Sequence, residues 1–159
     1  MKKISNPFSS QKGYHCFGCC HDNPIGLKLT FYDDGDEIVS VWHPRPEFQG
    51  YKNLLHGGIQ AALMDEIASW VVYTKLQTTG FTSNMQVRYR KSIHVENGPI
   101  TLRAKCMQMR RNLADIEVNL YDADNVLCAN ALVTYFTYDS KKAREQLFYP
   151  GHEAFFKEE

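Results

Sequence analysis

Two adjacent carboxylates, Asp65 and Glu66, interrupt an apolar stretch and are the first candidates for chemistry in this sequence. On a helix that turns about 100° per residue, Asp65 shares a face of small side chains with Ala61, Ala68 and Ser69. An unpaired ionised carboxylate in apolar surroundings is strongly unfavourable, so the chain needs a reason to keep two of them there. Catalysis is one reason, and a buried ion pair with an arginine across an interface is another.

The motif His56-Gly57-Gly58 stands just before these acids. Two glycines at a helix start leave backbone N–H groups approachable, and the helix dipole favours negative charge there, which suits a developing oxyanion. Glycine pairs also serve turns and close packing. Gly57 and Asp65 are eight residues apart, or about 12 Å along one helix, which is too far to share one carbonyl. Antiparallel helices from two copies would bring them together and give two equivalent sites.

A dense group near the N-terminus, consisting of His15, Cys16, Cys19, Cys20 and His21, contains ligands that zinc prefers. A structural zinc site normally joins two ligand pairs from separated segments, and this sequence has no second pair. We therefore expect reduced cysteines packed over the substrate entrance, with no metal and no other cofactor. The odd number of five cysteines in a chain without an export signal also argues against a disulfide framework.

The periodicity predicts an α+β fold in which an antiparallel sheet packs against one long helix. The helix is expected over residues 57–76. Its circumference is apolar almost everywhere, so we expect a curled sheet or a second subunit to cover it. The predicted strands span residues 27–32, 37–43, 83–90, 100–106, 115–120 and 126–138.

The predicted strands also include a turn signal and two face patterns. Asp33-Asp34-Gly35 is a strong turn signal between the first two. In the third, Ser83, Met85, Val87 and Tyr89 are predicted to share one face. The last strand is apolar on both sides, so it is expected to lie centrally in the sheet.

The length of 159 residues suits one domain. We expect an irregular arm over residues 1–26, the domain over 27–138, and a tail over 139–159 that begins with a short helix.

Lys plus Arg and Asp plus Glu are both 18, so no net charge favours nucleic acid. Neither a secretory leader nor a membrane-spanning run is found, which predicts a cytoplasmic protein without membrane contact.

The combined pattern resembles the hotdog-fold thioesterases of the phenylacetate-degradation type. The resemblance rests on His56-Gly57-Gly58, on the acid nine residues after the histidine, and on one helix between two strands and four. It extends over roughly residues 16–137 and includes Gln49-Gly50-Tyr51, Cys16-Phe17-Gly18-Cys19 and Asn23-Pro24-Ile25-Gly26-Leu27. It implies a hotdog fold, with the sheet wrapped around the central helix, and hydrolysis of an acyl-CoA thioester.

The resemblance also implies roles for individual residues. Asp65 acts as general base on water or as nucleophile, with Glu66 as the alternative acid. The Gly57 amide stabilises the oxyanion, and His56 orients the turn. Thr82 or Ser83, early in the strand after the helix, positions the water.

The basic residues Arg88, Arg90 and Lys91 are expected to bind CoA near a subunit boundary, since arginine suits phosphate. An ordinary solvated strand face is the other interpretation of this cluster, and Arg110 and Arg111 are weaker candidates. The expected assembly is a homodimer or a dimer of dimers.

Two rival functions remain. One is a non-catalytic protein that binds acyl-CoA at the same site without hydrolysing it. The other is a hotdog dehydratase, which we rank last because His56 and Asp65 lack the spacing that its motif requires.

Overall fold

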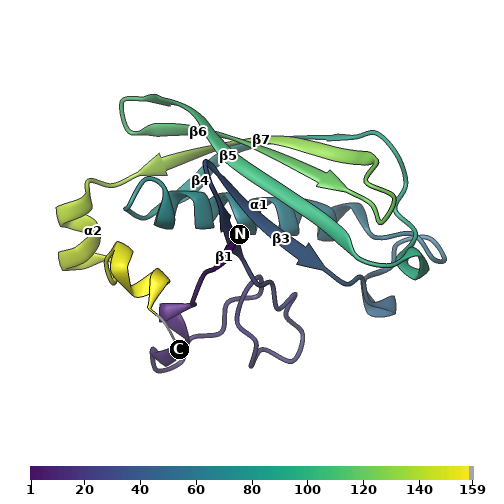
Figure 1. The fold of residues 1–159 in the computed structure, drawn as a ribbon, viewed down its shortest axis with the longest axis horizontal. Helices are drawn as coiled ribbons and strands as arrows, with labels where there is room; N and C mark the ends of the chain where they lie inside the picture. Colours follow the sequence, from purple (N-terminus) through teal and green to yellow (C-terminus); the bar gives the residue numbers. More distant parts are fainter. Residues whose placement is uncertain (158–159) are drawn as a thin grey trace.

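The computed structural model describes residues 1–157 of the chain, which fold into one antiparallel sheet packed against a long helix (Figure 1). The predicted α+β architecture is confirmed. Along the sheet the strand order is β1-β2-β3-β5-β6-β7-β4. The strands are β1 Lys2–Lys3, β2 Tyr32–Asp34, β3 Glu37–Trp42, β4 Gly80–Tyr89, β5 Ile100–Arg110, β6 Leu113–Tyr121 and β7 Leu127–Thr137. The helices are α1 Gly57–Thr74 and α2 Ser140–Gln146, and short 3-10 turns span Pro7–Ser10, Pro46–Phe48, Val95–Asn97 and His152–Phe156.

Helix α1 begins where the sequence predicts and ends two residues earlier, at Thr74. His56 caps its N-terminus, because the ring nitrogen Nδ1 accepts the N–H of Gly58 at 2.9 Å. At the other end, Lys75 donates to the carboxylate of Asp33 at 2.7 Å and to the carbonyl of Gly35 at 2.7 Å, which ties the helix to the β2–β3 hairpin. One side of α1 contacts strands β3 to β7. Within residues 1–157, no helix is both long and apolar enough to cross a membrane.

The side of α1 away from β5–β7 is covered by the two ends of the chain (Figure 1). Trp70 stacks on Phe31 with ring centroids 4.4 Å apart and meets the edge of Phe155 at 5.7 Å. Phe155 is fully buried, and Ile4 and Cys19 of the N-terminal segment belong to the same core. We expected a second subunit or a curled sheet to supply this cover, and the chain's own ends contribute much of it.

The segment 27–31 is not a strand, which corrects the predicted strand over 27–32. Leu27, Leu29 and Phe31 are buried in alternation as the period-two pattern predicts. Lys28, however, has a φ of 58°, in the left-handed region, so the backbone cannot continue a ladder there. The hairpin turn lies one residue later than predicted, because Asp34 pairs with Glu37 across a two-residue loop whose Gly35 has a φ of 71°.

Strand β7 is hydrogen-bonded on both sides, by β6 and by β4. The central placement predicted for residues 126–138 is nevertheless wrong, since β5 lies in the middle of the seven-strand order. One face of β7 is buried, but the other includes Leu132, which is 42% exposed, so apolar residues on both faces of this strand fixed neither its cover nor its position in the order.

A β-bulge between Thr82 and Asn84 breaks the alternation of β4. Thr82, Met85 and Val87 are half-buried, whereas Ser83 is exposed and donates its hydroxyl to the carbonyl of Thr134 at 3.0 Å. The prediction that Ser83 shares a face with Met85 and Val87 is therefore wrong, because the extra residue of the bulge reverses the phase. Strand β4 is also an edge strand, hydrogen-bonded only to β7 in the described chain.

Candidate active site

Asp65 meets a hydroxyl from the neighbouring strand. The Oγ1 of Thr82 on β4 donates to Oδ1 of Asp65 at 2.6 Å, and both residues are half-buried. The bulge in β4 directs Thr82 toward the helix and leaves Ser83 on the other face. Of the two hydroxyls that the sequence offered, the structure brings only Thr82 to Asp65. A carboxylate held through one oxygen keeps its other oxygen available for a second partner.

Tyr135 is a member of this site that sequence reasoning missed. It is the cross-strand partner of Thr82 on β7, and it is only 6% exposed. Burial, reinforced by the charge of Asp65, raises the pKa of Tyr135 to about 12. The phenol therefore stays protonated at neutral pH and remains a hydrogen-bond donor beside the carboxylate. No local pattern in the sequence marks Tyr135, because its place beside Thr82 follows from the pairing of β4 with β7.

Glu66 lies in different surroundings, although it is the next residue along α1. Its Oε1 accepts the indole N–H of Trp70 at 3.2 Å and the thiol of Cys16 at 3.5 Å. Burial, followed by the charge of Cys16, raises the pKa of Glu66 to about 7. The structure thus separates the two acids, with Asp65 facing Thr82 and Glu66 lying beneath the N-terminal segment.

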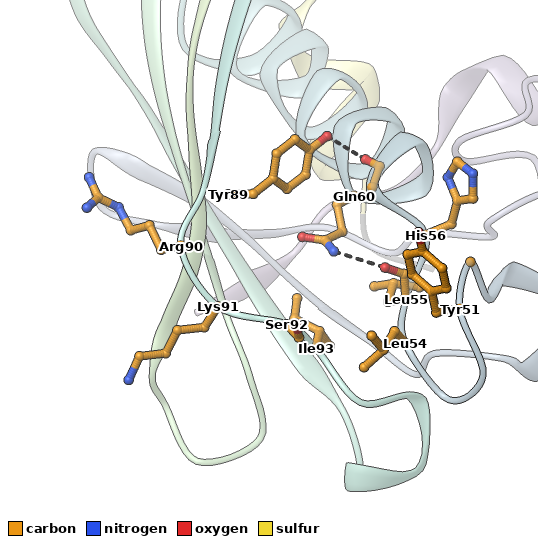
Figure 2. Close-up of a pocket in the computed structure, with 12 residues that line it drawn as sticks. Tyr51, Leu54, Leu55, His56, Gln60, Tyr89, Arg90, Lys91, Ser92 and Ile93 are labelled. Carbon is orange, nitrogen blue, oxygen red and sulfur yellow. Dashed lines mark hydrogen bonds between the residues drawn. The ribbon is translucent and has the colours of Figure 1, made fainter.

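The start of α1 opens into a cavity of about 580 Å³ (Figure 2). Gly57 occupies the first helical position, where an α-helix offers the amide no carbonyl of its own. The next amide, of Gly58, is already bound by His56. The hydroxyl of Tyr89 donates to the carbonyl of Gly57 at 2.6 Å, which fixes the first turn against β4. The lining residues are Gly50, Tyr51, Leu54, Leu55, His56, Gly57, Gln60, Tyr89, Arg90, Lys91, Ser92 and Ile93.

The cavity also contains a polar residue, Gln60, that the sequence analysis did not identify as a site residue. Gln60 is 5% exposed, and its amide nitrogen donates to the carbonyl of Leu55 at 3.1 Å. Its Oε1 is buried, and no donor within residues 1–157 satisfies it. A buried acceptor without a partner is unfavourable, so a donor group on a bound molecule would be stabilised there.

The predicted basic residues divide into two groups. Arg90 and Lys91 lie at the rim of the cavity, with side chains that extend outward (Figure 2). Arg90 is held by a 2.7 Å hydrogen bond from its Nε to Asn130. Arg88 is exposed and is not among the lining residues. The weaker candidate Arg110 binds Asp115 within its own hairpin.

Gly57 and Asp65 belong to two separate parts of the surface of one chain. Asp65 is not among the residues that line the cavity at Gly57. Eight residues of helix separate the two, which corresponds to about 12 Å along the axis. One chain therefore presents a carboxylate half-site with Thr82 and Tyr135, and an amide half-site with the basic rim.

Only Cys16 and Cys19 of the predicted cysteine and histidine group converge. His15 is exposed, the ring of His21 lies against the carbonyl of Leu29, and the thiol of Cys20 donates to the carbonyl of Tyr14. The five cysteines are all free, as predicted. The thiol of Cys19, followed by backbone N–H groups, lowers the pKa of Cys16 to about 5.

Comparison with known proteins identifies the fold. Residues 52–129 match the family model described as "Thioesterase superfamily". This match covers just under half of the chain and shows that this segment is similar to the thioesterase superfamily. The segment contains α1, β4 and both half-sites, apart from Tyr135. The hotdog fold that the sequence resemblance implies is thereby confirmed, with the sheet packed on the long helix.

Solved structures share this fold, and a curated relative is similar in sequence. A crystallised thioesterase superfamily protein superposes with a TM-score of 0.66 at 20% identity, over 72% of this chain and 56% of that one. A hypothetical thioesterase from Streptococcus pneumoniae, crystallised with coenzyme A, superposes with a TM-score of 0.64 at 21% identity, over 69% of this chain and 85% of that one.

The curated relative is a candidate esterase from Saccharolobus solfataricus, 27% identical over 59% of this chain. The alignment spans 62% of that relative's length.

Proposed function

We propose that this protein hydrolyses acyl-CoA thioesters, in the manner of the phenylacetate-degradation type, at a site shared by two copies of the chain. The observation that carries the proposal is the 2.6 Å hydrogen bond from Thr82 to Asp65, which orients a half-buried carboxylate on the central helix. The superfamily match supports hydrolysis, and the S. pneumoniae structure with coenzyme A supports the choice of thioester.

In the proposed reaction Asp65 is the general base. Its free oxygen takes a proton from water, and the resulting hydroxide adds to the thioester carbonyl. The Gly57 N–H of the second copy stabilises the oxyanion, because that amide has no carbonyl partner in its own helix and lies at the positive end of the helix dipole. The C–S bond then breaks, and the proton held by Asp65 passes to the CoA sulfur. Thr82 keeps the carboxylate in place, and the neutral Tyr135 lies beside Thr82 on the neighbouring strand.

The edge strand β4 supports the shared site. It is ten residues long and is hydrogen-bonded only to β7 in the described chain, so its free edge can pair with another strand. A second copy joined antiparallel along β4 would set the two α1 helices antiparallel, with the Gly57 of each toward the Asp65 of the other. The rim residues Arg90 and Lys91 would then lie beside the amide half-site, where they can meet CoA phosphates.

Steady-state hydrolysis of a panel of medium-chain and aromatic acyl-CoA esters tests the proposal. Asp65→Asn keeps the size of the side chain and removes the base, so we expect kcat to fall by about 100-fold or more with a normal melting temperature. Asp36→Asn makes the same chemical change in an exposed turn and is the matched control. Wild-type turnover in Asp65→Asn would refute the assignment of the base.

A non-catalytic acyl-CoA binder remains the second candidate, because the cavity and its unsatisfied Gln60 would bind ligand whether or not hydrolysis follows. Saturable binding of CoA esters to the wild type, with no release of free thiol for any ester of the panel, would favour that function over the proposed one.

A further inference from the structure

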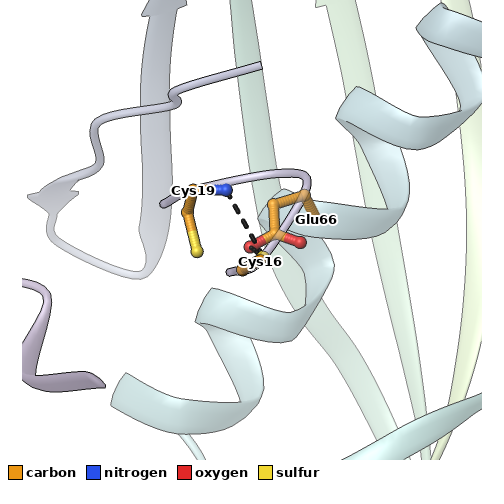
Figure 3. Close-up of side chains that lie close together, drawn as sticks. All are labelled: Cys16, Cys19 and Glu66. Carbon is orange, nitrogen blue, oxygen red and sulfur yellow. Dashed lines mark hydrogen bonds between the residues drawn. The ribbon is translucent and has the colours of Figure 1, made fainter. Parts of the chain in front are cut away.

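A second cluster of chemically active side chains lies between the N-terminal segment and α1 (Figure 3). The sulfurs of Cys16 and Cys19 and a carboxylate oxygen of Glu66 all lie within 4.8 Å of one another. Cys16 and Cys19 come from the N-terminal segment and Glu66 from the helix, fifty residues along the chain from Cys16. Cys19 is buried, and the other two are half-buried. The proposed hydrolysis uses none of these groups.

The backbone of the N-terminal segment is shaped to fit over this carboxylate. A Cβ on Gly18 would lie 2.3 Å from Cδ of Glu66, so a side chain at position 18 would displace the carboxylate. The loop is fixed by two backbone hydrogen bonds, from Leu27 to the carbonyl of Phe17 at 2.7 Å and from Leu29 to the carbonyl of Gly18 at 3.0 Å. These two hydrogen bonds fix the loop, and the loop therefore places both sulfurs next to Glu66.

Each of the three groups has a hydrogen-bonding neighbour that can stabilise it as an anion. The backbone N–H of Cys19 donates to the sulfur of Cys16 at 3.4 Å. The hydroxyl of Tyr14 lies 2.9 Å from the sulfur of Cys19, and the indole N–H of Trp70 donates to Glu66. Such contacts orient metal ligands and tune their basicity. Over residues 1–157, no lysine, arginine or histidine forms an ion pair with Glu66.

We propose that Cys16, Cys19 and Glu66 bind a zinc ion, with water as the fourth ligand. Two thiolates and a carboxylate are ligands that zinc accepts, and soft sulfur selects against magnesium and calcium. Zn–S bonds of about 2.3 Å in a tetrahedral site place two sulfurs about 3.8 Å apart. Ligand atoms already within 4.8 Å reach that geometry by closing about 1 Å at most. The two thiol protons leave to solvent as the metal binds.

The proposed site departs from the expectation that the early cysteines bind no metal. The sequence argument required a second pair of ligands, and the fold instead supplies one distant carboxylate as the third ligand. Bound zinc would tie the N-terminal segment to α1 at the residue next to Asp65. The proposal does not depend on the hydrolytic function.

Metal content and cobalt spectra test the site directly. The full chain, without a polyhistidine tag, is purified in a non-chelating reductant, dialysed with zinc, passed over a chelating resin and assayed by mass spectrometry for metals. We expect about one zinc per chain. Replacing zinc with cobalt(II) should give sulfur-to-metal charge-transfer bands in the near ultraviolet and the intense visible bands of a tetrahedral site.

Variants identify the ligands. We expect Cys16→Ser, Cys19→Ser and Glu66→Gln each to weaken zinc binding by tenfold or more, measured by competition with a chromophoric chelator. Cys20→Ser is the matched control, because Cys20 is equally buried in the same loop and lies outside the cluster. It should bind zinc as the wild type does.

A measurement on the wild type alone keeps the test valid if a variant fails to fold. Zinc should protect the half-buried Cys16 from alkylation, and a strong chelator should remove that protection while the half-buried Cys106 reacts equally in both states. The proposal would be overturned by substoichiometric zinc in the wild type or by unchanged zinc affinity in the three ligand variants. Protection from alkylation that remains after the chelator is added would overturn it too. So would a Cys16–Cys19 disulfide with no bound metal, which would assign the pair to redox chemistry instead.

Discussion

Replacing Thr82 with valine removes one hydroxyl from the carboxylate half-site and preserves the size and branching of the side chain. The lost hydrogen bond is short, 2.6 Å, and its acceptor is a half-buried carboxylate. Hydrogen bonds to charged groups contribute about 1.5–3 kcal/mol. If Thr82 holds Asp65 in the reactive orientation, a loss of that size in the transition state lowers kcat by about 10- to 150-fold. KM should change little, because Thr82 is not among the residues that line the cavity proposed to bind the acyl-CoA ester.

Steady-state kinetics with an acyl-CoA ester, alongside thermal melting, measure this effect. Thr82→Ser restores the hydroxyl and should recover most of the lost kcat, which separates positioning from packing. Ser83→Ala removes the adjacent hydroxyl, whose bond goes to the carbonyl of Thr134 on the other face, and should behave as the wild type does. An unchanged kcat in Thr82→Val, or an equal loss in Ser83→Ala, would refute the reasoning.

Two further predictions concern stability. Phe155→Ala should lower the free energy of unfolding by about 3–5 kcal/mol in urea titrations, because its ring is fully buried against Trp70; a loss below about 1 kcal/mol would mean that this end of the chain is not part of the core. Asp115→Asn should lose about 2 kcal/mol at pH 7, since Arg110, Gln108 and Thr134 all donate to that carboxylate. These donors, Arg110 first, hold the pKa of Asp115 well below its usual range, so the stabilisation is complete above about pH 4 and is lost as pH falls through the lowered pKa. The gap between variant and wild type should therefore close in acid, and a gap that stays constant down to pH 2 would contradict the role of that charge.

Local patterns were enough to predict most of the fold. The apolar stretch without proline predicted α1 to within two residues, and period-two alternation found the long strands β5 and β6. The helix cap is equally local, because the N–H of Gly58 donates to the ring of His56, two residues earlier. These features depend on neighbouring residues, so one sequence suffices to find them.

What the sequence could not supply depends on contacts between distant segments or on single backbone angles. The bulge that selects Thr82 over Ser83 follows from the pairing of β4 with β7. The left-handed φ of Lys28 ended a strand that the side-chain pattern favoured. The approach of Cys16 to Glu66 joins residues fifty apart, and no periodicity encodes such a contact.

The claim on which the proposed function depends is that Asp65 and Gly57 of one site come from different chains. Gly57→Pro removes the oxyanion N–H at the first helical position, where proline is tolerated, and the extended ψ of 133° at His56 suits a residue before proline. Alone, it should lower kcat by about 100-fold or more, as should Asp65→Asn.

Co-expression of the two inactive chains with different tags, followed by hydrolysis assays on the mixture, is the most direct measurement. Each mixed dimer contains one site with an intact Asp65 from one chain and an intact Gly57 from the other. Random pairing therefore predicts recovery of about a quarter of wild-type activity. Activity no greater than the average of the two separate variants, in a mixture shown to contain mixed dimers, would contradict the shared site.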